Sequence, residues 1–461
     1  MAEQCAVAVI GGGVTGLCAV HYLSEKFGPD QILLIEAGEY VGGQTRTTTV
    51  EGFSCDWGPN GFLDREPLTL KWTEDLGIAD ELVRAHAASA HRFILKGGKL
   101  VEVPLSPPKF LTSPLLSPLA RARVLMEPLI RRRTSDDPES LWHFAARRIG
   151  RQAADLMIDP MACGIFGGDA KQLSLSHCFP KMAEMEAQYG SLFRAMLAKR
   201  KEKKNVSAAG PAGTLTSFAG GIGYLPEVAA ARPGSRTLKN TRAIRISRAH
   251  GSFCIATDVG PEVEARGVVV ALPAYAAASV CADLDGPLSS ALAEIPYADI
   301  VVLCTGYRRE HVGHDLNGFG FVVPRNQKRR VLGCIWTTSV FPGRAPEGCV
   351  QLRTMYGGYT DPDILELTDK ELLGWLKREV EDLLQISGGP EFVQIFRWPR
   401  GIPQFTLEHG RRLAAIVAGE ARYPGLVFAG NAYRGVGLND CVVSAHRAVS
   451  KLRSLPLSKP N

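Results

Sequence analysis

The sequence lacks the features that mark membrane-spanning, disordered and nucleic-acid-binding proteins. No apolar run is long enough to cross a bilayer, and the closest, 268–281, is interrupted by Pro273. A net charge of +6 is small for 461 residues and gives no reason to expect a nucleic-acid partner. With 45% hydrophobic and 22% charged residues, the chain has the composition of a folded protein with more than one domain.

Patterns for metal binding, disulfides and hydrolytic catalysis are also missing. The eleven cysteines are an odd number and never show CxxC spacing, and the ten histidines lack ligand spacing. No Ser-His-Asp order, HExxH or Walker sequence is present. We therefore expect no metal, a reduced cytoplasmic setting, and cysteines that serve as small core residues. Because the first predicted strand starts almost at residue 1, we also expect no secretory signal.

The most informative positive feature is a glycine cluster near the N-terminus. An apolar run at 6–10 predicts a buried parallel strand, and Gly11, Gly13 and Gly16 follow it at the spacing of a strand that turns sharply into a helix. Glycines alone also fit an ordinary turn. A second apolar run ends on Glu36, whose carboxylate can accept both ribose hydroxyls of an adenosine. Together these features predict a dinucleotide site.

The next motif favours FAD over NAD. Residues 41–46 add a second glycine pair, where backbone can approach phosphate, with Arg46 close behind. The glycines at 220–223 follow no long buried strand, so we interpret them as a tight turn before a helix. Without a nicotinamide site or a redox cysteine pair, the organic substrate must reduce the flavin. The chain is then an oxidase or desaturase whose flavin is reoxidised by oxygen or a quinone.

Apolar patterns divide the remaining chain. The run at 267–272 predicts another parallel strand of the first sheet, whereas 300–355 predicts a mixed or antiparallel sheet. Residues 107–133 have a different pattern: the segment is apolar, interrupted by prolines and flanked by arginines. It fits either a hairpin lying in a lipid headgroup layer or a helical subdomain whose leucines form their own core.

Several motifs distributed along the chain resemble one family. They are GGGVTGL, VGGQTRT, WGPNGFLDREP, AHRFILKGGKLVEVP, CGIFGGDAKQLSL, FPKMAEMEAQYGSLFRAM, GFGFVVP, VLGCIWTTSVFPGRAP, RWPRGIPQ and GNAYRGVGLNDC. In this order they resemble the FAD-dependent, oxygen-using protoporphyrinogen IX oxidases, a family that includes coproporphyrinogen oxidases and is related to flavin amine oxidases. The resemblance extends over nearly the whole chain.

The resemblance implies an α/β (α+β overall) fold in three parts. A discontinuous, Rossmann-like FAD domain would contain residues 1–86, 215–285 and 395–461. A mixed-sheet substrate domain would contain 87–105 and 286–394. A helical, membrane-facing domain would contain 106–214.

The resemblance also implies one noncovalent FAD per chain, since no cysteine or histidine matches a tethering position. Gln44 and Asn60 depart from the residues of many relatives without threatening this site. The expected cofactor contacts are Gly11, Gly12, Gly13, Val14, Thr15, Gly16, Glu36, Ala37, Gly42, Gly43, Gln44, Arg46, Gly58, Pro59, Asn60, Gly61, Ala243, Trp398, Gly430, Asn431, Val436, Gly437 and Leu438.

For the substrate, the resemblance assigns Arg92 to a propionate carboxylate. Val322, Ile335 and Met355 would sandwich the flat macrocycle, and backbone at Gly164 would approach it from the face opposite the flavin. Without the resemblance, Arg92 reads as a surface arginine and the apolar residues as ordinary core. No catalytic side chain is expected, because a pyrrole nitrogen can stabilise the cation left by hydride transfer to flavin N5.

The expected reaction is oxidation of protoporphyrinogen IX to protoporphyrin IX by oxygen, with hydrogen peroxide as co-product, in haem biosynthesis. Coproporphyrinogen III is the alternative substrate; its additional propionates call for more cations than Arg92 alone. More remote alternatives are a flavin amine oxidase, which Asn431 after Gly430 disfavours, and a non-enzymatic escort protein. The expected partners are the porphyrinogen, oxygen, a second copy of the chain, a chelatase that takes the product, and the inner face of the cell membrane through 107–133.

Overall fold

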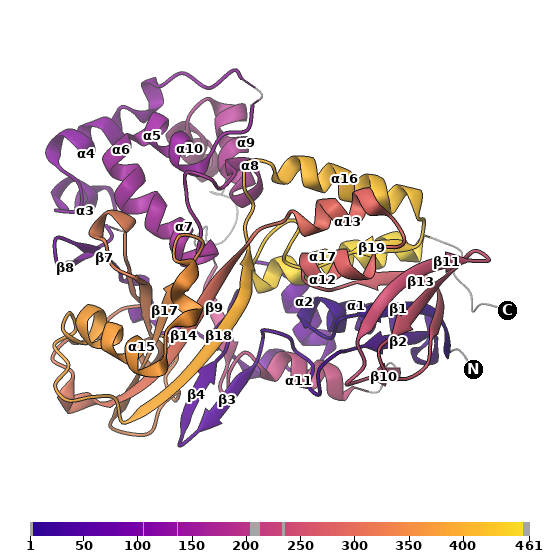
Figure 1. The fold of residues 1–461 in the computed structure, drawn as a ribbon. Helices are drawn as coiled ribbons and strands as arrows, with labels where there is room; N and C mark the ends of the chain where they lie inside the picture. Colours follow the sequence, from indigo (N-terminus) through magenta and orange to yellow (C-terminus); the bar gives the residue numbers. More distant parts are fainter. Residues whose placement is uncertain (1–2, 105, 136, 203–212, 233–235, 455–461) are drawn as a thin grey trace.

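The computed structural model describes residues 3–104, 106–135, 137–202, 213–232 and 236–454. Two seven-stranded sheets and a group of helices form its three main parts (Figure 1). In that view the sheet that holds β1 lies at the right, the sheet that holds β14 at the left, and the helices from α3 to α10 at the upper left. The mixed α/β architecture predicted from the sequence is confirmed.

The first sheet has a parallel centre built from the predicted apolar runs. Its path is β10-β2-β1-β13-β12-β11, and β19 also pairs with β13. The pairs that join β10, β2, β1, β13 and β19 are parallel, whereas β12 and β11 extend the sheet in antiparallel fashion. The predicted parallel strand at 267–272 is therefore confirmed as the end of β13. The strands are β1 (Glu3–Ile10), β2 (Ile32–Ile35), β10 (Arg236–Leu238), β11 (Ala243–Ala249), β12 (Ser252–Thr257), β13 (Val263–Val270) and β19 (Leu426–Phe428).

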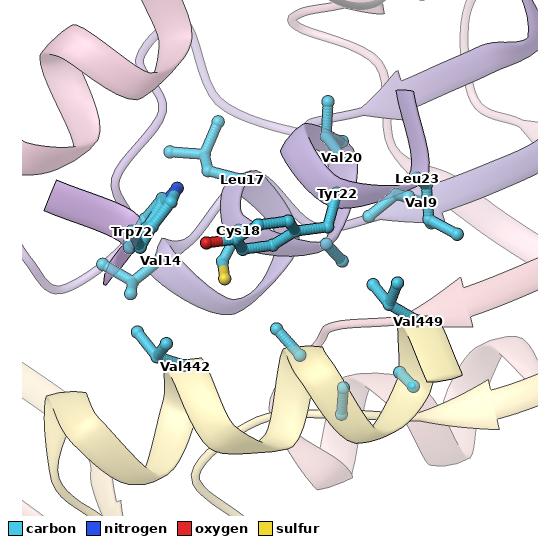
Figure 2. Close-up of a cluster of buried hydrophobic side chains, with 14 of the residues drawn as sticks. Val9, Val14, Leu17, Cys18, Val20, Tyr22, Leu23, Trp72, Val442 and Val449 are labelled. Carbon is cyan, nitrogen blue, oxygen red and sulfur yellow. The ribbon is translucent and has the colours of Figure 1, made fainter. Parts of the chain in front are cut away.

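Helices pack on both faces of this sheet through two buried clusters. In Figure 2, Val14 of α1 and Val442 of α17 lie at one end of the first cluster, with Leu23 and Val449 at the other, so these two helices run in the same direction. On that face lie α1 (Val14–Phe27), α2 (Pro67–Asp75), α11 (Tyr224–Ala231) and α17 (Leu438–Arg453). On the opposite face lie α12 (Ala274–Val280), α13 (Gly286–Ala293) and α16 (His409–Arg422).

The second sheet follows the path β18-β14-β17-β16-β15-β7-β8 and is antiparallel except for the β15–β7 pair. One face packs against α15 (Asp369–Leu376) through a cluster that includes Leu352 and Leu372. β18 begins before the expected domain boundary at 395 and stays paired with β14 as far as Pro403. The strands are β7 (Arg92–Lys96), β8 (Lys99–Glu102), β14 (Tyr297–Arg308), β15 (Gly320–Val322), β16 (Val331–Trp336), β17 (Cys349–Gly357) and β18 (Phe392–Pro403).

Two small sheets and the short helix α14 (Thr337–Val340) complete the fold. One sheet is a hairpin and the other has the order β5-β9-β6. Their strands are β3 (Thr47–Val50), β4 (Phe53–Asp56), β5 (Phe62–Leu63), β6 (Leu82–Arg84) and β9 (Leu215–Phe218).

The helical region contains its own apolar clusters and also leaves apolar side chains exposed. Leu116 and Val124 pack inward with Leu156, whereas Leu119 and Leu129 are 85% and 73% exposed. The buried leucines agree with a helical subdomain that has its own core, and contact with a lipid layer stays a prediction. Over the described residues, no helix is both long and apolar enough to cross a membrane. The helices are α3 (Pro107–Thr112), α4 (Pro118–Leu125), α5 (Leu141–Ile149), α6 (Arg151–Ala153), α7 (Asp159–Phe166), α8 (Leu175–Cys178), α9 (Pro180–Tyr189) and α10 (Leu192–Glu202).

Candidate active site

The turn after β1 requires glycine at two positions and leaves open space at a third. A Cβ atom on Gly11 would lie 2.5 Å from the carbonyl oxygen of Ala271, and one on Gly16 would overlap the carbonyl oxygen of Gly11. At Gly13, by contrast, an added Cβ would meet no other part of the protein within 4 Å. The first and third glycines therefore serve backbone packing, and the second faces a space that a phosphate can enter.

The start of α1 is suited to hold an anion. Gly13 precedes the helix without a side-chain cap, and the first turn carries no acidic residue, so the first N–H groups and the positive end of the helix dipole remain available. The second glycine loop lies directly beside it, because Gly13 forms a bridge with Gly42, and the Gly42 N–H donates to the Gly12 carbonyl at 2.7 Å. The guanidinium of Arg46 lies 4.3 Å from the ring centre of Trp57 in the same region.

Glu36 directly follows β2 and lies beside these loops. One carboxylate oxygen accepts the Gly12 N–H at 2.6 Å, and the other accepts the Gly38 N–H at 2.7 Å. The side chain remains partly accessible, and Ala37 beside it is exposed. Ala243 begins β11 two residues after Thr241, whose N–H donates to the Glu36 carbonyl. Glu36 thus both orients the glycine turn and presents carboxylate lone pairs at the expected ribose position.

The loop at 57–61 joins the first part of the molecule to the second sheet. A Cβ on Gly58 would overlap the Gln44 carbonyl, and one on Gly61 would lie 2.5 Å from the Thr216 carbonyl. Trp398 of β18 donates its indole N–H to the Trp57 carbonyl at 2.9 Å. Gln44 donates to the Gly401 carbonyl at 3.0 Å and so links the same two parts.

The C-terminal residues assigned to the cofactor follow β19. The Gly430 N–H donates to Ser444 of α17 at 3.0 Å, and Asn431 is half-buried beside it. Val436 packs against the cluster of the helical region, while Gly437 and Leu438 start α17. Because α1 and α17 run in the same direction, their N-termini lie at the same side of the sheet (Figure 2).

The residues assigned to the substrate share one face of the second sheet. Val322 pairs with Gly333, which pairs with Met355; Gly320 pairs with both Ile335 and Arg92. Paired residues point to the same side, and positions two apart in one strand do so too. Arg92, Val322, Ile335 and Met355 therefore face the same way. Gly164 of α7 approaches this face, because a Cβ there would lie 3.3 Å from Val322.

Sequence reasoning missed one charged member of this face, Arg353. It pairs with Ile335 across β16 and β17, and it is 5% exposed. Its Nε donates to the Asp56 carbonyl at 3.4 Å, and its Nη2 donates to the Gly58 carbonyl. The signal was available in β17, because residue 353 lies two positions before Met355 and must point to the same side of a regular strand.

The side chains of this face can orient a bound molecule and contact its charged groups, but few of them could donate or accept a proton. Its central rows hold Phe396, Val302, Met355, Gly333, Val322 and Ile94, then Gln394, Cys304, Arg353, Ile335, Gly320 and Arg92. Asp56, the acid at the edge of the 57–61 loop, has its pKa raised by burial, although Arg344 at 3.7 Å and a hydrogen bond from Thr47 oppose that rise. Within the described residues no cluster of His, Cys, Asp or Glu side chains could hold a metal.

Comparison with known proteins gives this arrangement a family. The chain matches the flavin containing amine oxidoreductases over residues 14–452. The chain belongs to this family. This flavin-containing oxidoreductase is 28% identical over 457 residues to coproporphyrinogen III oxidase of Bacillus subtilis (strain 168), covering 96% of this chain and 97% of the relative. It is 30% identical over 469 residues to a chloroplastic protoporphyrinogen oxidase of Oryza sativa subsp. japonica, covering 96% and 87%.

A solved structure from Exiguobacterium sp. 255-15 resembles this oxidoreductase in fold, with a TM-score of 0.84 and 26% identity over 98% of this chain and 99% of that one. The resemblance inferred from the sequence motifs is confirmed by these relatives. The flavin predicted from the glycine loops is supported by the family itself.

Replacing Glu36 by alanine should weaken flavin binding by tenfold or more, because a charge-assisted hydrogen bond is worth about 1.5–3 kcal/mol. The change also removes the acceptor of the Gly12 and Gly38 N–H groups. Titration of the apoprotein with FAD, followed by flavin fluorescence, measures the loss. Glu36→Gln keeps one carbonyl acceptor, so its FAD affinity should lie between those of the wild type and Glu36→Ala. Equal affinity of all three proteins would remove Glu36 from the cofactor site.

Proposed function

We propose that the protein oxidises a porphyrinogen to the corresponding porphyrin in tetrapyrrole biosynthesis, with FAD as the hydride acceptor and molecular oxygen as the final acceptor. The observation that carries this proposal is the shared face of the second sheet, where Arg92 and three apolar residues point the same way. One of them, Met355, packs in a cluster with Trp57 of the loop at 57–61. Relatives named as protoporphyrinogen and coproporphyrinogen oxidases, similar over nearly the whole chain, support it.

The glycine loops fit FAD. Gly13 faces open space at an uncapped helix N-terminus, which suits a pyrophosphate, and Glu36 presents a carboxylate where an adenosine ribose would lie. The N-terminus of α17 lies at the same side of the sheet. When bound, FAD supplies an acceptor for the hydride of a methylene bridge. Residues 1–86, 215–285 and most of 395–461 would form the domain that holds it.

The remaining work of the site is binding and orientation. Arg92 would hold a propionate, while Val322, Ile335 and Met355 would contact the macrocycle and exclude water from the bridge carbon. Gly164 would allow the α7 backbone to approach from the other side. Electron-rich pyrroles stabilise positive charge at the oxidised bridge, so a face without a carboxylate or histidine suffices for this chemistry.

The decisive experiment is turnover by the purified yellow protein. Protoporphyrinogen IX and coproporphyrinogen III are supplied under air, porphyrin is followed by fluorescence, and peroxide and oxygen are measured in the same sample. The proposal requires porphyrin formation with three peroxides for each porphyrin. Failure to oxidise either porphyrinogen by a flavin-loaded protein would overturn the proposed function, and turnover with a quinone but without peroxide would replace oxygen as the acceptor.

We also propose a peripheral contact with the inner face of the cell membrane through 107–133. Leu111, Leu119, Leu125, Met126 and Leu129 are at least half exposed, and the exposed arginines at 131 and 132 follow them. Apolar side chains beside cations suit an anionic lipid surface.

Leu119→Glu should lower binding to vesicles that contain anionic lipid by about tenfold, because inserting one leucine is worth roughly 1.5–3 kcal/mol. Co-sedimentation with the vesicles measures the bound fraction. The matched control is Val417→Glu, an exposed apolar residue of α16. An equal loss for both variants would contradict a specific role for 107–133.

A further inference from the structure

Arg353 is a buried cation that shares the charge of Asp56 with a second arginine, Arg344. The carboxylate of Asp56 accepts hydrogen bonds from Thr47 and from the Ile222 N–H, and it lies 3.7 Å from Arg344. Among the described residues no carboxylate lies within ion-pair distance of Arg353 itself. A guanidinium buried to this degree normally has an anionic partner.

The protein contacts of Arg353 leave part of its hydrogen-bonding capacity free. Its Nε and Nη2 donate to backbone carbonyls at Asp56 and Gly58, and its Nη1 lies 3.6 Å from the Met355 sulfur. A guanidinium has five N–H donors, so two remain after these contacts. The side chain thus lies between a flavin loop and a residue of the proposed substrate wall, with donors to offer to a further acceptor.

Arg353 and Arg92 lie on one row of the second sheet. The row runs from Arg353 in β17 through Ile335 in β16 and Gly320 in β15 to Arg92 in β7. Three strand spacings separate the two arginine Cα atoms by about 14 Å. Between them on this row are one apolar side chain, Ile335, and one glycine, Gly320.

We propose that Arg353 is a second carboxylate-binding residue of the porphyrinogen site and that, with Arg92, it selects a substrate with propionates on opposite edges of the macrocycle. The inference rests on the proposed function and specifies its substrate. Coproporphyrinogen III has a propionate on each of its four pyrroles and can engage both arginines. Protoporphyrinogen IX has its two propionates on neighbouring pyrroles at one edge and presents vinyl groups at the other.

This proposal reverses the preference drawn from the sequence. Protoporphyrinogen IX was favoured because Arg92 was the one cation that could be assigned to an otherwise apolar wall. The strand register adds a second cation to the same face. A vinyl group placed against Arg353 would give this buried charge no anionic partner, whereas a propionate would supply two oxygens to its free donors.

The test compares the wild type and three variants with two substrates. Arg353→Met keeps a long side chain without charge, Arg353→Lys keeps the charge without the fork, and Arg92→Ala is the matched control at the other arginine. Initial rates give kcat and KM for coproporphyrinogen III and protoporphyrinogen IX, and the flavin absorbance of each variant gives its FAD content. Wild-type protein should already have the higher kcat/KM for coproporphyrinogen III.

Arg353→Met should raise KM for coproporphyrinogen III by about tenfold or more and change KM for protoporphyrinogen IX less than about threefold, with Arg353→Lys intermediate. Arg92→Ala should raise KM for both substrates. Equal losses for both substrates in Arg353→Met, or loss of FAD, would overturn the proposal and make Arg353 a link between β17 and the flavin loop. If Arg353→Met does not fold, a wild-type preference for protoporphyrinogen IX still refutes the assignment. Turnover of neither substrate refutes the proposed function instead.

Discussion

Gly13→Ala is expected to lower FAD affinity by about 100-fold or more while leaving the apoprotein as stable as the wild type. The added methyl group would point into space free of other protein atoms, and the backbone at residue 13 has φ −71°, which alanine adopts readily. In the complex the same methyl group would keep the pyrophosphate from the backbone. Loss of two charged hydrogen bonds of about 1.5–3 kcal/mol each gives this magnitude.

The matched variant is Gly16→Ala, three residues along the same helix. Here the new Cβ overlaps the Gly11 carbonyl, so the apoprotein itself should lose stability. Thermal unfolding of both apoproteins and FAD titration of those that fold separate the two effects. A Gly13→Ala protein that binds FAD normally would show that the phosphate does not approach this turn.

The cofactor turn could be predicted because its determinants are local. Gly11 and Gly16 meet backbone within the strand–turn–helix unit or on the adjoining strand, and Glu36 lies at the end of the next strand. Such short-range geometry leaves a readable spacing in the sequence. The order of the motifs along the chain also predicted the family. The domain boundary expected at 395 was less exact, because β18 stays paired with β14 across that position.

The substrate face was predicted only in part because it depends on register between distant strands. Arg353 joins Arg92 on one row only after β17, β16, β15 and β7 are aligned, and these strands are separated by up to about 260 residues. A register irregularity between Val331 and Gly333 further uncouples position in the sequence from side of the sheet. Alternation within β17 was the one local signal for Arg353.

In the helical region, the burial of individual side chains likewise could not be predicted from the sequence. Its leucines alternate between the interior and solvent without a sequence difference that separates them, since Leu116 is buried and Leu119 is exposed. Two further residues fix its interior, and no pattern in the sequence indicates either of them. Glu127 and Arg148 form an ion pair in which both side chains are fully buried.

Arg148→Met is expected to destabilise the helical region by about 3–5 kcal/mol, because it leaves the Glu127 carboxylate buried without its cation. Arg148 also donates to the carbonyls of Ile130 and Gly190, so its loss removes the hydrogen bonds that join α5 to these two positions. Hydrogen exchange of amides in α5 and α9 should accelerate more than about a hundredfold, as this free energy implies. The first sheet lies outside these contacts, so FAD content should be retained.

The stability that the Glu127–Arg148 pair contributes should also depend on pH. Burial alone would raise the pKa of Glu127, but hydrogen bonds from Ser191, the Leu192 N–H and Arg148 outweigh it and lower the pKa below its usual 4.5. A lowered folded-state pKa means that this stabilisation is complete above the unfolded value and is lost as the pH falls through the folded one. In Arg148→Met the carboxylate loses one of these donors, so its folded-state pKa rises toward the unfolded value, and the helical region should lose less stability on acidification than it does in the wild type.

The neighbouring variant Arg147→Met controls for helix position and for loss of a cation. Arg147 pairs with Glu139 and Glu186 but is 27% exposed, so its removal should cost less than that of Arg148. Adding Glu127→Gln to Arg148→Met removes the unpaired charge and should recover part of the lost stability. Equal destabilisation by the two arginine variants, with no recovery in the double variant, would mean that packing of the arginine stem, rather than the buried charge, holds these helices together.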